Sequence, residues 1–423
     1  MTWEAKLLLW RTKPLVVAVT GSVGKTTTKD AIYTVVKKGV WARKSEKSYN
    51  SEVGVPLSVL GLPNGWSDPI SWLKNISDGL VIALFPGDYP KVLVLEVGVD
   101  RPGDMVNLTN WLKPDVVVLT RLPVVPVHVE FFPNPEAVVE EKMQLVKAIK
   151  PDGTVVYNAD DPLIVEKISE IDNVKKVSFG LNSGADFWAE ELEIAFTQYR
   201  PVGTKARILH HEEQADVEMV GVVGSGPLYA YVSAVAVGSL FDVSLKDAVT
   251  MLSEMSPTPG RMRLVPGIKR TMMIDDTYNS SPAAVEQALC AVRDMRSYGY
   301  RKLAILGDML ELGRYSTAEH EKVGELVATC VDALVAVGVR ARSIAMSAER
   351  AGMPPERISI FENVDEVAKV LLNELEEGDL ILIKGSQGMR LERLVKALME
   401  DPEQAGEWLV RQEDVWGKKN PIA

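Results

Sequence analysis

The chain has 423 residues, a charged fraction of 25% and a formal net charge of −11. This length exceeds what one hydrophobic core usually serves, so we expect two or three domains. The acidic balance argues against nucleic acid as a partner, because a phosphate backbone would be repelled. Two cysteines exclude a disulfide framework and a four-cysteine zinc site, and they favour a reducing, cytoplasmic location.

The first segment, residues 1–14, carries two tryptophans around an apolar run. It does not resemble a cleavable signal peptide, because it is short and has basic residues on both sides of the run. No segment of the sequence reaches the run of about 20 apolar residues that spans a bilayer. Two interpretations of Trp3 to Trp10 stay open, namely a short helix that caps the first domain and a weak contact with a membrane surface.

Residues 15–29 read LVVAVTGSVGKTTTK, an apolar strand followed by a glycine-rich turn, a lysine and three threonines. Such a turn lets successive backbone N–H groups face one anion, and the following helix adds its positive N-terminal end. Lys25 is then expected at the terminal phosphates of a nucleotide and Thr26 at Mg²⁺. The usual pattern has glycine five places before Gly24, where this chain has Val19, so the loop is a shortened variant. An ordinary strand-turn-helix is the weaker alternative.

Apolar strand-like runs then alternate with amphipathic helical stretches, which predicts an α/β fold with parallel sheets and crossover helices. Each predicted strand of the first half ends in polar or small residues, where an open α/β sheet has its ligand crevice. We expect a central phosphate-loop sheet domain over residues 1–256. Its predicted strands are Leu15 to Thr20, Val92 to Val97, Val116 to Thr120 and Thr154 to Asn158.

The pattern changes to alternating, β-rich segments between Ala185 and Val223, which predicts a small antiparallel flap within this domain. A helical pair follows from Leu228 to Met255. Ser256 to Gly260, with two prolines and a glycine, then predicts an interdomain hinge. A second, Rossmann-like α/β domain is expected over residues 257–423. Its predicted strands are Thr271 to Ile274, Leu303 to Leu306, Ala333 to Val337, Ile358 to Phe361 and Leu380 to Ile383.

Polar residues near the first-domain strand ends are candidates for chemistry, and each has a plainer alternative. Glu96 could ligate Mg²⁺ or be a solvated strand-end carboxylate. His128 has apolar and aromatic neighbours, which are more typical of a core histidine than of a ligand. Lys142 stands in a helical stretch, where an exposed lysine is the plain interpretation. Residues 158–161, Asn-Ala-Asp-Asp, are typical of a loop or a helix cap.

Jointly, these segments resemble the Mur ligases, the ATP-dependent family that joins amino acids or peptides to cell-wall precursors. The similarity is greatest to the MurF branch, which adds D-alanyl-D-alanine, and it runs in order along nearly the whole chain. The last three matching segments are specific to that branch. The matches are TGSVGKTTTK (20–29), YNSEVGVPLSVL (49–60), LEVGVDRPGDM (95–105), HVEFFPNPEAVVEEK (128–142), YNADDP (157–162), PGRMRLV (259–265), IDDTYNSSP (274–282), AILGDMLELG (304–313) and IKGSQGMRLERLV (383–395).

The resemblance implies a role for each matching residue. The residues implied in catalysis are Lys25, His128 and Lys142. The residues implied at ATP are Gly21, Ser22, Val23, Gly24, Lys25, Thr26, Thr27, Arg261, Asp276 and Asn279. The residues implied at two Mg²⁺ ions are Thr26, Glu96, His128 and Lys142, with Lys142 carbamylated so that it becomes an anion. The residues implied at the substrates are Asn50, Asp308, Glu311, Lys384 and Ser386, although Asp308 could instead form a strand-end turn.

The implied reaction activates a carboxylate as an acyl phosphate and joins it to an amine, with the second domain closing across the hinge to exclude water. The expected substrates are a muramoyl peptide donor and a D-alanyl-D-alanine acceptor, and the expected state is a monomer. Two alternatives stay open. One is a relative with another donor, folylpolyglutamate-like or lipid-linked, and the other is a catalytically silent nucleotide-binding scaffold.

Two departures from the family bear on these expectations. Family members of the MurF branch have a domain before the ATP domain that helps to hold the uridine nucleotide, whereas here the strand of the phosphate loop begins at Leu15. The resemblance therefore implies a ligase without that domain, and the donor stays open. The family also places a His-Asn-x-x-Asn segment where this chain has Ser225 to Tyr229. Adenine could stack on Tyr229 or be held differently.

Overall fold

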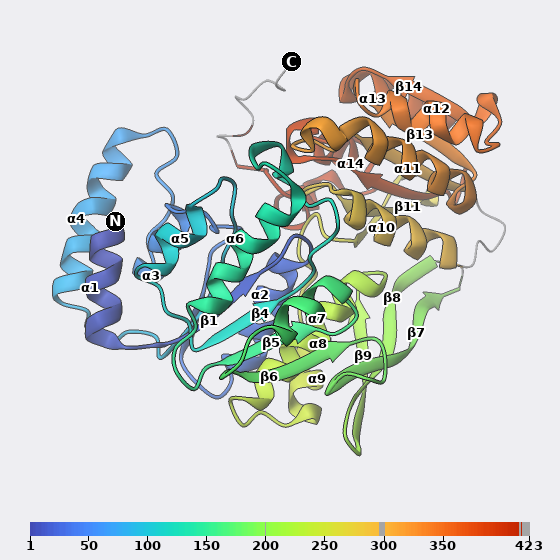
Figure 1. The fold of residues 1–423 in the computed structure, drawn as a ribbon. Coiled ribbons are helices and arrows are strands. Elements are labelled where there is room, and N and C mark those ends of the chain that lie inside the picture. The colour runs from blue at the N-terminus through green and yellow to red at the C-terminus, as the bar shows by residue number, and fades with distance from the viewer. Residues whose placement is uncertain (199, 296–300, 414–415, 417–423) are drawn as a thin grey trace.

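The computed structural model of the chain describes residues 1–198, 200–295, 301–413 and 416, which form two sheets with helices packed around them (Figure 1). The first sheet contains nine strands and the second contains six. In spatial order, the strands of the first sheet are β2 (Ala42–Lys44), β3 (Val92–Glu96), β1 (Leu15–Thr20), β4 (Val116–Leu119), β5 (Thr154–Asn158), β6 (Lys175–Gly180), β7 (Phe187–Thr197), β8 (Arg200–His210) and β9 (Glu213–Val220).

Strand β1 carries apolar side chains on both of its faces, as a central parallel strand does. Val16 and Ala18 belong to one buried cluster and Val17 and Val19 to another, so successive residues point to opposite faces of the sheet. The helices around this sheet are α1 (Thr2–Thr12), α2 (Lys25–Val36), α3 (Gly54–Leu60), α4 (Pro69–Leu84), α5 (Asp104–Thr109), α6 (Pro135–Lys147), α7 (Pro162–Ser169), α8 (Ser225–Ser239) and α9 (Leu245–Ser253).

The position of β1 fixes where a ligand can bind. It pairs in parallel with β3 on one side and with β4 on the other. Later strands therefore lie on both sides of β1, so the strand order reverses there. In an open α/β sheet the ligand crevice forms beyond the carboxyl end of such a strand. The phosphate loop follows β1 directly, so the fold places it at this crevice.

The antiparallel strands predicted as a flap are β7, β8 and β9, and they are an extension of the first sheet. Strand β7 pairs in parallel with β6 through Phe179 and Phe187, and antiparallel with β8. The alternating pattern reports that one face is buried, but it does not report which strand lies next to which. Strands β2 and β6 were not predicted, because β2 spans three residues and β6 begins with two lysines.

The second sheet has one antiparallel edge strand, β10, which pairs with β11, and its other strands are parallel. Its order is β10 (Arg263–Pro266), β11 (Met272–Asp276), β15 (Leu380–Lys384), β12 (Lys302–Gly307), β13 (Ala333–Val337) and β14 (Ile358–Phe361). Its helices are α10 (Pro282–Asp294), α11 (Ser316–Cys330), α12 (Arg342–Arg350), α13 (Val364–Glu374), α14 (Glu392–Leu398) and α15 (Ala405–Trp408).

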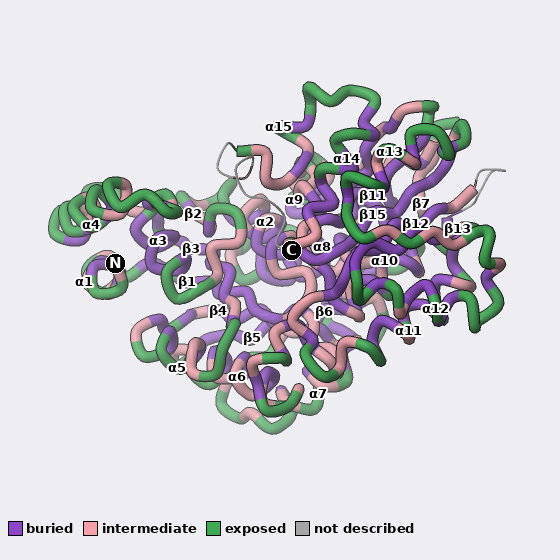
Figure 2. Tube along the Cα trace, turned by 90° about the horizontal axis from the view of Figure 1, so that it is seen from above, coloured by how far each residue is buried: buried purple, intermediate pink, exposed green. Residues whose placement is uncertain are grey.

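Burial follows the two sheets. The strands and the inner sides of their helices are buried, while the outer sides of the helices are exposed (Figure 2). Residues 256–260, the predicted hinge, form neither helix nor strand and connect α9 to β10. Among the described residues, none of the helices has both the length and the apolar character needed to cross a bilayer.

Candidate active site

The phosphate loop lies between β1 and α2, and its glycines have conformations that few other residues adopt. Gly24 caps the N-terminus of α2 with a φ of 85°, and a Cβ placed there would meet open space. Gly21 has a φ of 140°, and a Cβ there would lie 2.1 Å from Thr120 Oγ1. Glycine at 21 is thus required by the neighbouring strand, while the open side of Gly24 leaves room for an anion at the helix N-terminus.

Lys25 folds back over this loop and donates from Nζ to the carbonyl oxygen of Gly21 at 3.0 Å. Burial lowers the pKa of Lys25, with a further lowering from Arg261, against the opposing effect of Glu96 and Asp100. The carboxylates of Glu96 and Asp100 are thus close enough to influence this amine. A phosphate bound at the loop would therefore pair with the ammonium group of Lys25 and offset the cost of burying that charge.

Glu96 at the end of β3 is 1% exposed, so the solvated alternative is wrong. Its Oε1 accepts a hydrogen bond from Asn50 Nδ2 at 2.9 Å, but its buried Oε2 has no hydrogen-bond partner among the described residues. Thr26 and Ser48 share a hydrogen bond at 3.0 Å between their hydroxyl oxygens. Carboxylate and hydroxyl oxygens are the ligands that Mg²⁺ prefers. A buried carboxylate oxygen without a partner is costly, and binding Mg²⁺ would supply that partner. Ser48 gave no motif signal in the sequence.

His128 is half-buried and lies between the two halves of the chain. Its Nε2 is 3.5 Å from Asp100, and its Nδ1 is 2.9 Å from Glu311, which follows β12 of the second sheet. The close contact with His128 lowers the pKa of Glu311, against the effect of burial. A purely core position for His128 is therefore excluded, because its ring faces carboxylates from two separate segments.

Lys142 on α6 is 2% exposed, so the interpretation of an exposed helix lysine is wrong. Burial, with the charge of Lys25, lowers its pKa to about 7. Within the residues that the structure describes, no group of three or more His, Cys, Asp or Glu side chains is placed to share one metal ion. Glu96 and His128 line the same cleft, whereas the buried Lys142 does not line it.

The second sheet brings Arg261 to the phosphate loop from the opposite side. Its Nη2 donates to Thr26 Oγ1 at 3.3 Å, and its guanidinium carbon lies 4.1 Å from the ring centroid of Tyr278. Its Nε is buried without a partner among the described residues. The guanidinium of Arg261 is held over an aromatic ring and retains an unused donor, which suits contact with an anion.

Other residues expected at the cleft make their contacts within the protein. Lys384, expected on the acceptor side, instead donates to Asp276 Oδ2 at 2.6 Å and lines a smaller pocket. Asp308 accepts from the backbone N–H of Ala341 at 2.7 Å. This contact matches the strand-end turn that was its alternative. Ser386 does line the cleft, and its Oγ accepts from the N–H of Leu310 at 2.8 Å.

Two adjoining cavities result from this arrangement. The larger, with about 2840 Å³ of empty space that opens to solvent, runs along the crevice between the two sheets. It gathers candidate residues from both sides of the hinge. Those that line it are Ser22, Val23, Gly24, Lys25, Thr26, Asn50, Glu96, His128, Arg261, Asn279, Glu311 and Ser386.

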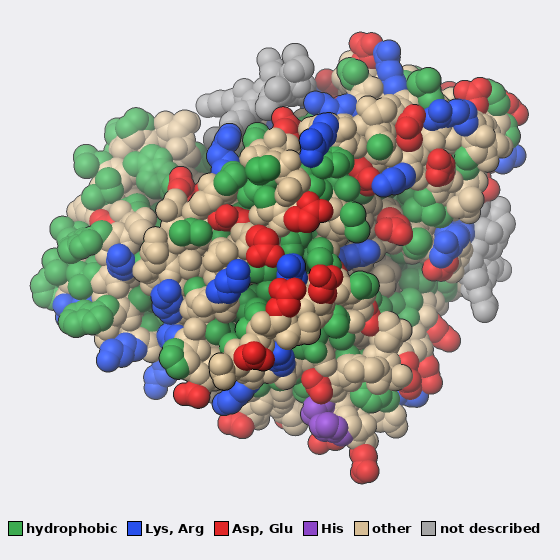
Figure 3. Space-filling model, in the orientation of Figure 1, with side chains coloured by type: hydrophobic (Ala, Val, Ile, Leu, Met, Phe, Trp, Pro, Cys, Tyr) green, Lys and Arg blue, Asp and Glu red, His purple; other side chains and the backbone are tan. Residues whose placement is uncertain are grey.

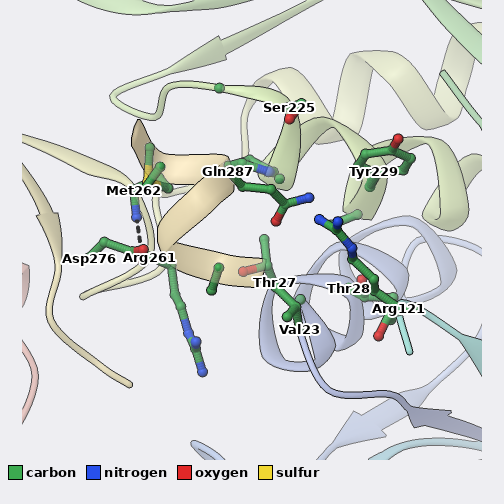
Figure 4. A pocket seen from close by; sticks show the side chains of 18 of the residues that line it. Val23, Thr27, Thr28, Arg121, Ser225, Tyr229, Arg261, Met262, Asp276 and Gln287 are labelled. Carbon is green, nitrogen blue, oxygen red and sulfur yellow. Dashed lines mark hydrogen bonds between the residues drawn. The ribbon is translucent and has the colours of Figure 1, made fainter. Parts of the chain in front are cut away.

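The smaller cavity has about 790 Å³ of empty space and lies beside the loop (Figure 4). Val23 and Thr27 line it from the loop and α2, and Gln287 reaches in from α10 of the second half. Tyr229 on α8 donates to Asp160 Oδ2 at 2.9 Å, and burial raises its pKa. The segment Ser225 to Tyr229 therefore borders a mostly apolar pocket with a few fixed polar groups, which is typical of a site for a nucleotide base. Gln287 gave no motif signal in the sequence.

Comparisons with known proteins agree with this geometry. A family model described as the Mur ligase middle domain matches residues 19–238, and one described as the Mur ligase glutamate ligase domain matches residues 260–387. The chain belongs to the Mur ligase family. Apart from the start of β1, the two sheets, the helical pair and the hinge of this Mur ligase thus fall within or between the two matched segments.

Three relatives extend the comparison. The UDP-N-acetylmuramoyl-tripeptide--D-alanyl-D-alanine ligase of Bacillus subtilis (strain 168) is 27% identical over 94% of this Mur ligase and 79% of its own length. The crystal structure of the MurF ligase from Thermotoga maritima with ADP has a TM-score of 0.74 at 25% identity, covering 95% of this chain and 83% of that one. A MurF from Acinetobacter baumannii shares the fold, with a TM-score of 0.76 at 22% identity over 94% of this chain and 80% of that one.

Proposed function

We propose that this Mur ligase joins D-alanyl-D-alanine to a UDP-linked muramoyl tripeptide, with conversion of ATP to ADP and phosphate. The B. subtilis relative carries the name of that activity. The observation that carries the proposal is the single cleft in which Lys25 and Glu96 face Arg261 and Glu311. A scaffold that only binds a nucleotide would not need acidic and basic groups on both sides of such a cleft.

The chemistry explains why these groups are needed. A carboxylate does not condense with an amine in water, so one of its oxygens attacks the γ-phosphorus of ATP, and the bond from that phosphorus to the bridging oxygen breaks to release ADP. The amine nitrogen then attacks the carbonyl carbon of the acyl phosphate and loses a proton, and the C–O bond to phosphate breaks. Lys25 and Arg261, on opposite sides of the transferred group, would offset the repulsion between the carboxylate and the triphosphate.

Thr26 Oγ1 and the unpaired Oε2 of Glu96 would hold Mg²⁺. When bound, this ion neutralises charge on the phosphate oxygens. We propose a second ion beside His128, supported by the anion that forms if Lys142 is carbamylated. In that step the neutral amine of Lys142 adds to CO₂, a C–N bond forms, and one proton is released. Burial and the cation of Lys25 both favour the neutral amine, and that cation also favours the anionic carbamate.

The base of ATP would occupy the smaller pocket. Tyr229, held in place by Asp160, offers an aromatic face, and Gln287 offers an amide that can pair with a base edge. Because Gln287 and Arg261 belong to the second half of the chain, nucleotide binding would hold the two halves together. We propose that residues 1–256 and 257–423 move as two bodies about the segment Ser256 to Gly260.

Small-angle scattering tests this movement. The radius of gyration should fall when ATP analogue, Mg²⁺ and donor are added together, because the second body closes onto the first. An unchanged scattering curve under saturating ligands would contradict the two-body proposal. It would leave the proposed reaction untouched, since that is measured by turnover.

Phosphate release tests the function itself. With ATP and Mg²⁺, release should require both the UDP-muramoyl tripeptide and D-alanyl-D-alanine. Lys142→Ala should abolish turnover, whereas Lys147→Ala, an exposed lysine on the same helix, should retain it within about twofold. The lack of any turnover that depends on donor and acceptor would favour the scaffold. Full activity of Lys142→Ala would show that a carbamate at Lys142 is not needed for turnover.

A further inference from the structure

Helix α4 exposes large apolar side chains that an ordinary surface helix would bury. Its inner face is formed by Asn75, Gly79 and Ala83, which are buried at intervals of four residues. A Cβ on Gly79 would approach Leu60 and Leu62, so the small residues let α4 lie close to the protein. A surface helix normally buries its large apolar side chains, whereas α4 buries small residues and exposes most of its large apolar ones.

The outward face of α4 carries large apolar side chains in a continuous stripe. Ile70 is 78% exposed and Leu73 is 70% exposed, and Phe85 follows the helix at 77%. Ordinary exposed leucines occur singly and need no explanation, but a contiguous apolar face marks an interaction site. The stripe consists of Ile70, Leu73, Ile76, Leu80, Val81, Leu84 and Phe85.

Helix α1 lies beside α4 and enlarges this face (Figures 1 and 2). Trp3 is 62% exposed and Trp10 is 72% exposed, and their spacing of seven residues puts them on one side of the helix. Apolar side chains gather at this end of the molecule (Figure 3). We name the stripe of α4 together with Trp3 and Trp10 the α1–α4 face.

The charges around this face differ in sign from the rest of the chain. The exposed charged side chains of α1, of the residue after it and of α4 are basic, namely Lys6, Arg11, Lys13 and Lys74, and the exposed Asp68 that caps α4 is the acidic exception. Glu4 is buried and forms an ion pair with the N-terminal amine, which leaves Asp78 as the one acidic side chain of the two helices that is not buried. The whole chain has a net charge of −11. A basic rim is thus concentrated where the apolar side chains are exposed.

We propose that the α1–α4 face docks on an anionic bilayer surface, with both helices lying in the interface. Tryptophans beside lysine and arginine, on a helix face that is otherwise aliphatic, are the combination that partitions into the headgroup region. The basic side chains around the face complement anionic lipid headgroups. The acidic surface of a second copy of the chain, outside its own α1–α4 face, would gain nothing from contact with the apolar stripe. This binding is independent of the ligase reaction.

Vesicle flotation of the full chain tests the proposal. The chain should float with vesicles of equal parts phosphatidylglycerol and phosphatidylcholine, and at least tenfold less with phosphatidylcholine alone. Leu73→Ser/Leu80→Ser should weaken partition at least tenfold, because two inserted leucines are removed. Val339→Ser/Met346→Ser is the matched control, since it removes two exposed apolar side chains from the second half and should bind as the parent does.

A second variant separates charge from folding. Lys6→Gln/Arg11→Gln/Lys74→Gln changes exposed side chains that form no hydrogen bond or ion pair with other described residues, and it should also reduce flotation with phosphatidylglycerol vesicles. Circular dichroism melting should be unchanged in each variant. Absence of flotation of the parent chain, or equal loss in the control, would overturn the proposal. A concentration-dependent dimer in light scattering that Leu73→Ser/Leu80→Ser dissolves would assign the face to a second copy and overturn it as well.

Discussion

The two walls of the cleft differ in how many of their polar groups are already satisfied. On the wall from the first sheet, Glu96 has a buried oxygen without a partner among the described residues, and Lys25 is desolvated. In the second half of the chain, Lys384 and Asp308 do not line the cleft, and they are paired with Asp276 and with the N–H of Ala341. The comparison indicates that the first wall is built to receive ligands, whereas the second half is a frame of internally paired charges that projects Glu311 and Arg261, with its unpaired Nε, towards it.

The largest effect should come from the first wall. Lys25→Met removes the cation at the loop while keeping the stem of the side chain, so kcat should fall by about 10³-fold, as when one preorganised donor is lost. Lys38→Met, at an exposed position just after α2, is the control and should retain activity. Steady-state phosphate release measures both. Retained turnover in Lys25→Met would mean that the loop does not stabilise the transferred phosphoryl group.

A smaller effect is expected where the second wall projects a single group. Arg261→Lys keeps the charge but loses the planar guanidinium that lies on Tyr278 and reaches Thr26, so kcat should fall by roughly 10-fold to 100-fold. The exposed Arg293→Lys, on α10, should leave kcat unchanged. Equal rates for Arg261→Lys and the parent would place Arg261 outside the reaction and weaken the contrast between frame and projected residue.

The smallest effect on rate should come from the frame itself. Asp308→Ala leaves the buried N–H of Ala341 without an acceptor, so the free energy of unfolding should fall by about 1–3 kcal/mol, while kcat/KM changes less than about twofold. Asp308→Asn keeps an oxygen for that N–H and should restore most of the stability. Chemical denaturation and steady-state kinetics check this. Unchanged stability with a raised KM for D-alanyl-D-alanine would return Asp308 to the acceptor site.

The sequence predicted those features of the fold that depend on a local pattern of residues. The phosphate loop follows from its glycines, and the parallel strands follow from short apolar runs between helical stretches. The burial of Glu96 and Lys142 could not be deduced from their neighbours alone, because it depends on which elements cover them. The contacts of His128 with Glu311 and of Lys384 with Asp276 join segments far apart in the chain, and no spacing rule predicts them.

The membrane interpretation of the first helix shows the same limit. Trp3 and Trp10 suggested it, but the exposed stripe that supports it belongs to α4, whose apolar pattern alone also fits an ordinary buried helix. The direction of each face became evident only when the small residues Asn75, Gly79 and Ala83 were found on the inside. The periodicity of one helix shows that it has an apolar face, but it does not show which face packs against the rest of the protein.

Isotope transfer shows whether the cleft activates a carboxylate as an acyl phosphate. A UDP-muramoyl tripeptide labelled with ¹⁸O at both oxygens of its reacting carboxylate is incubated with the enzyme, ATP, Mg²⁺ and D-alanyl-D-alanine. We predict that each phosphate released carries one ¹⁸O and that the new amide retains the other, as mass spectrometry would report. Unlabelled phosphate, released at the rate of ATP consumption, would contradict the claim.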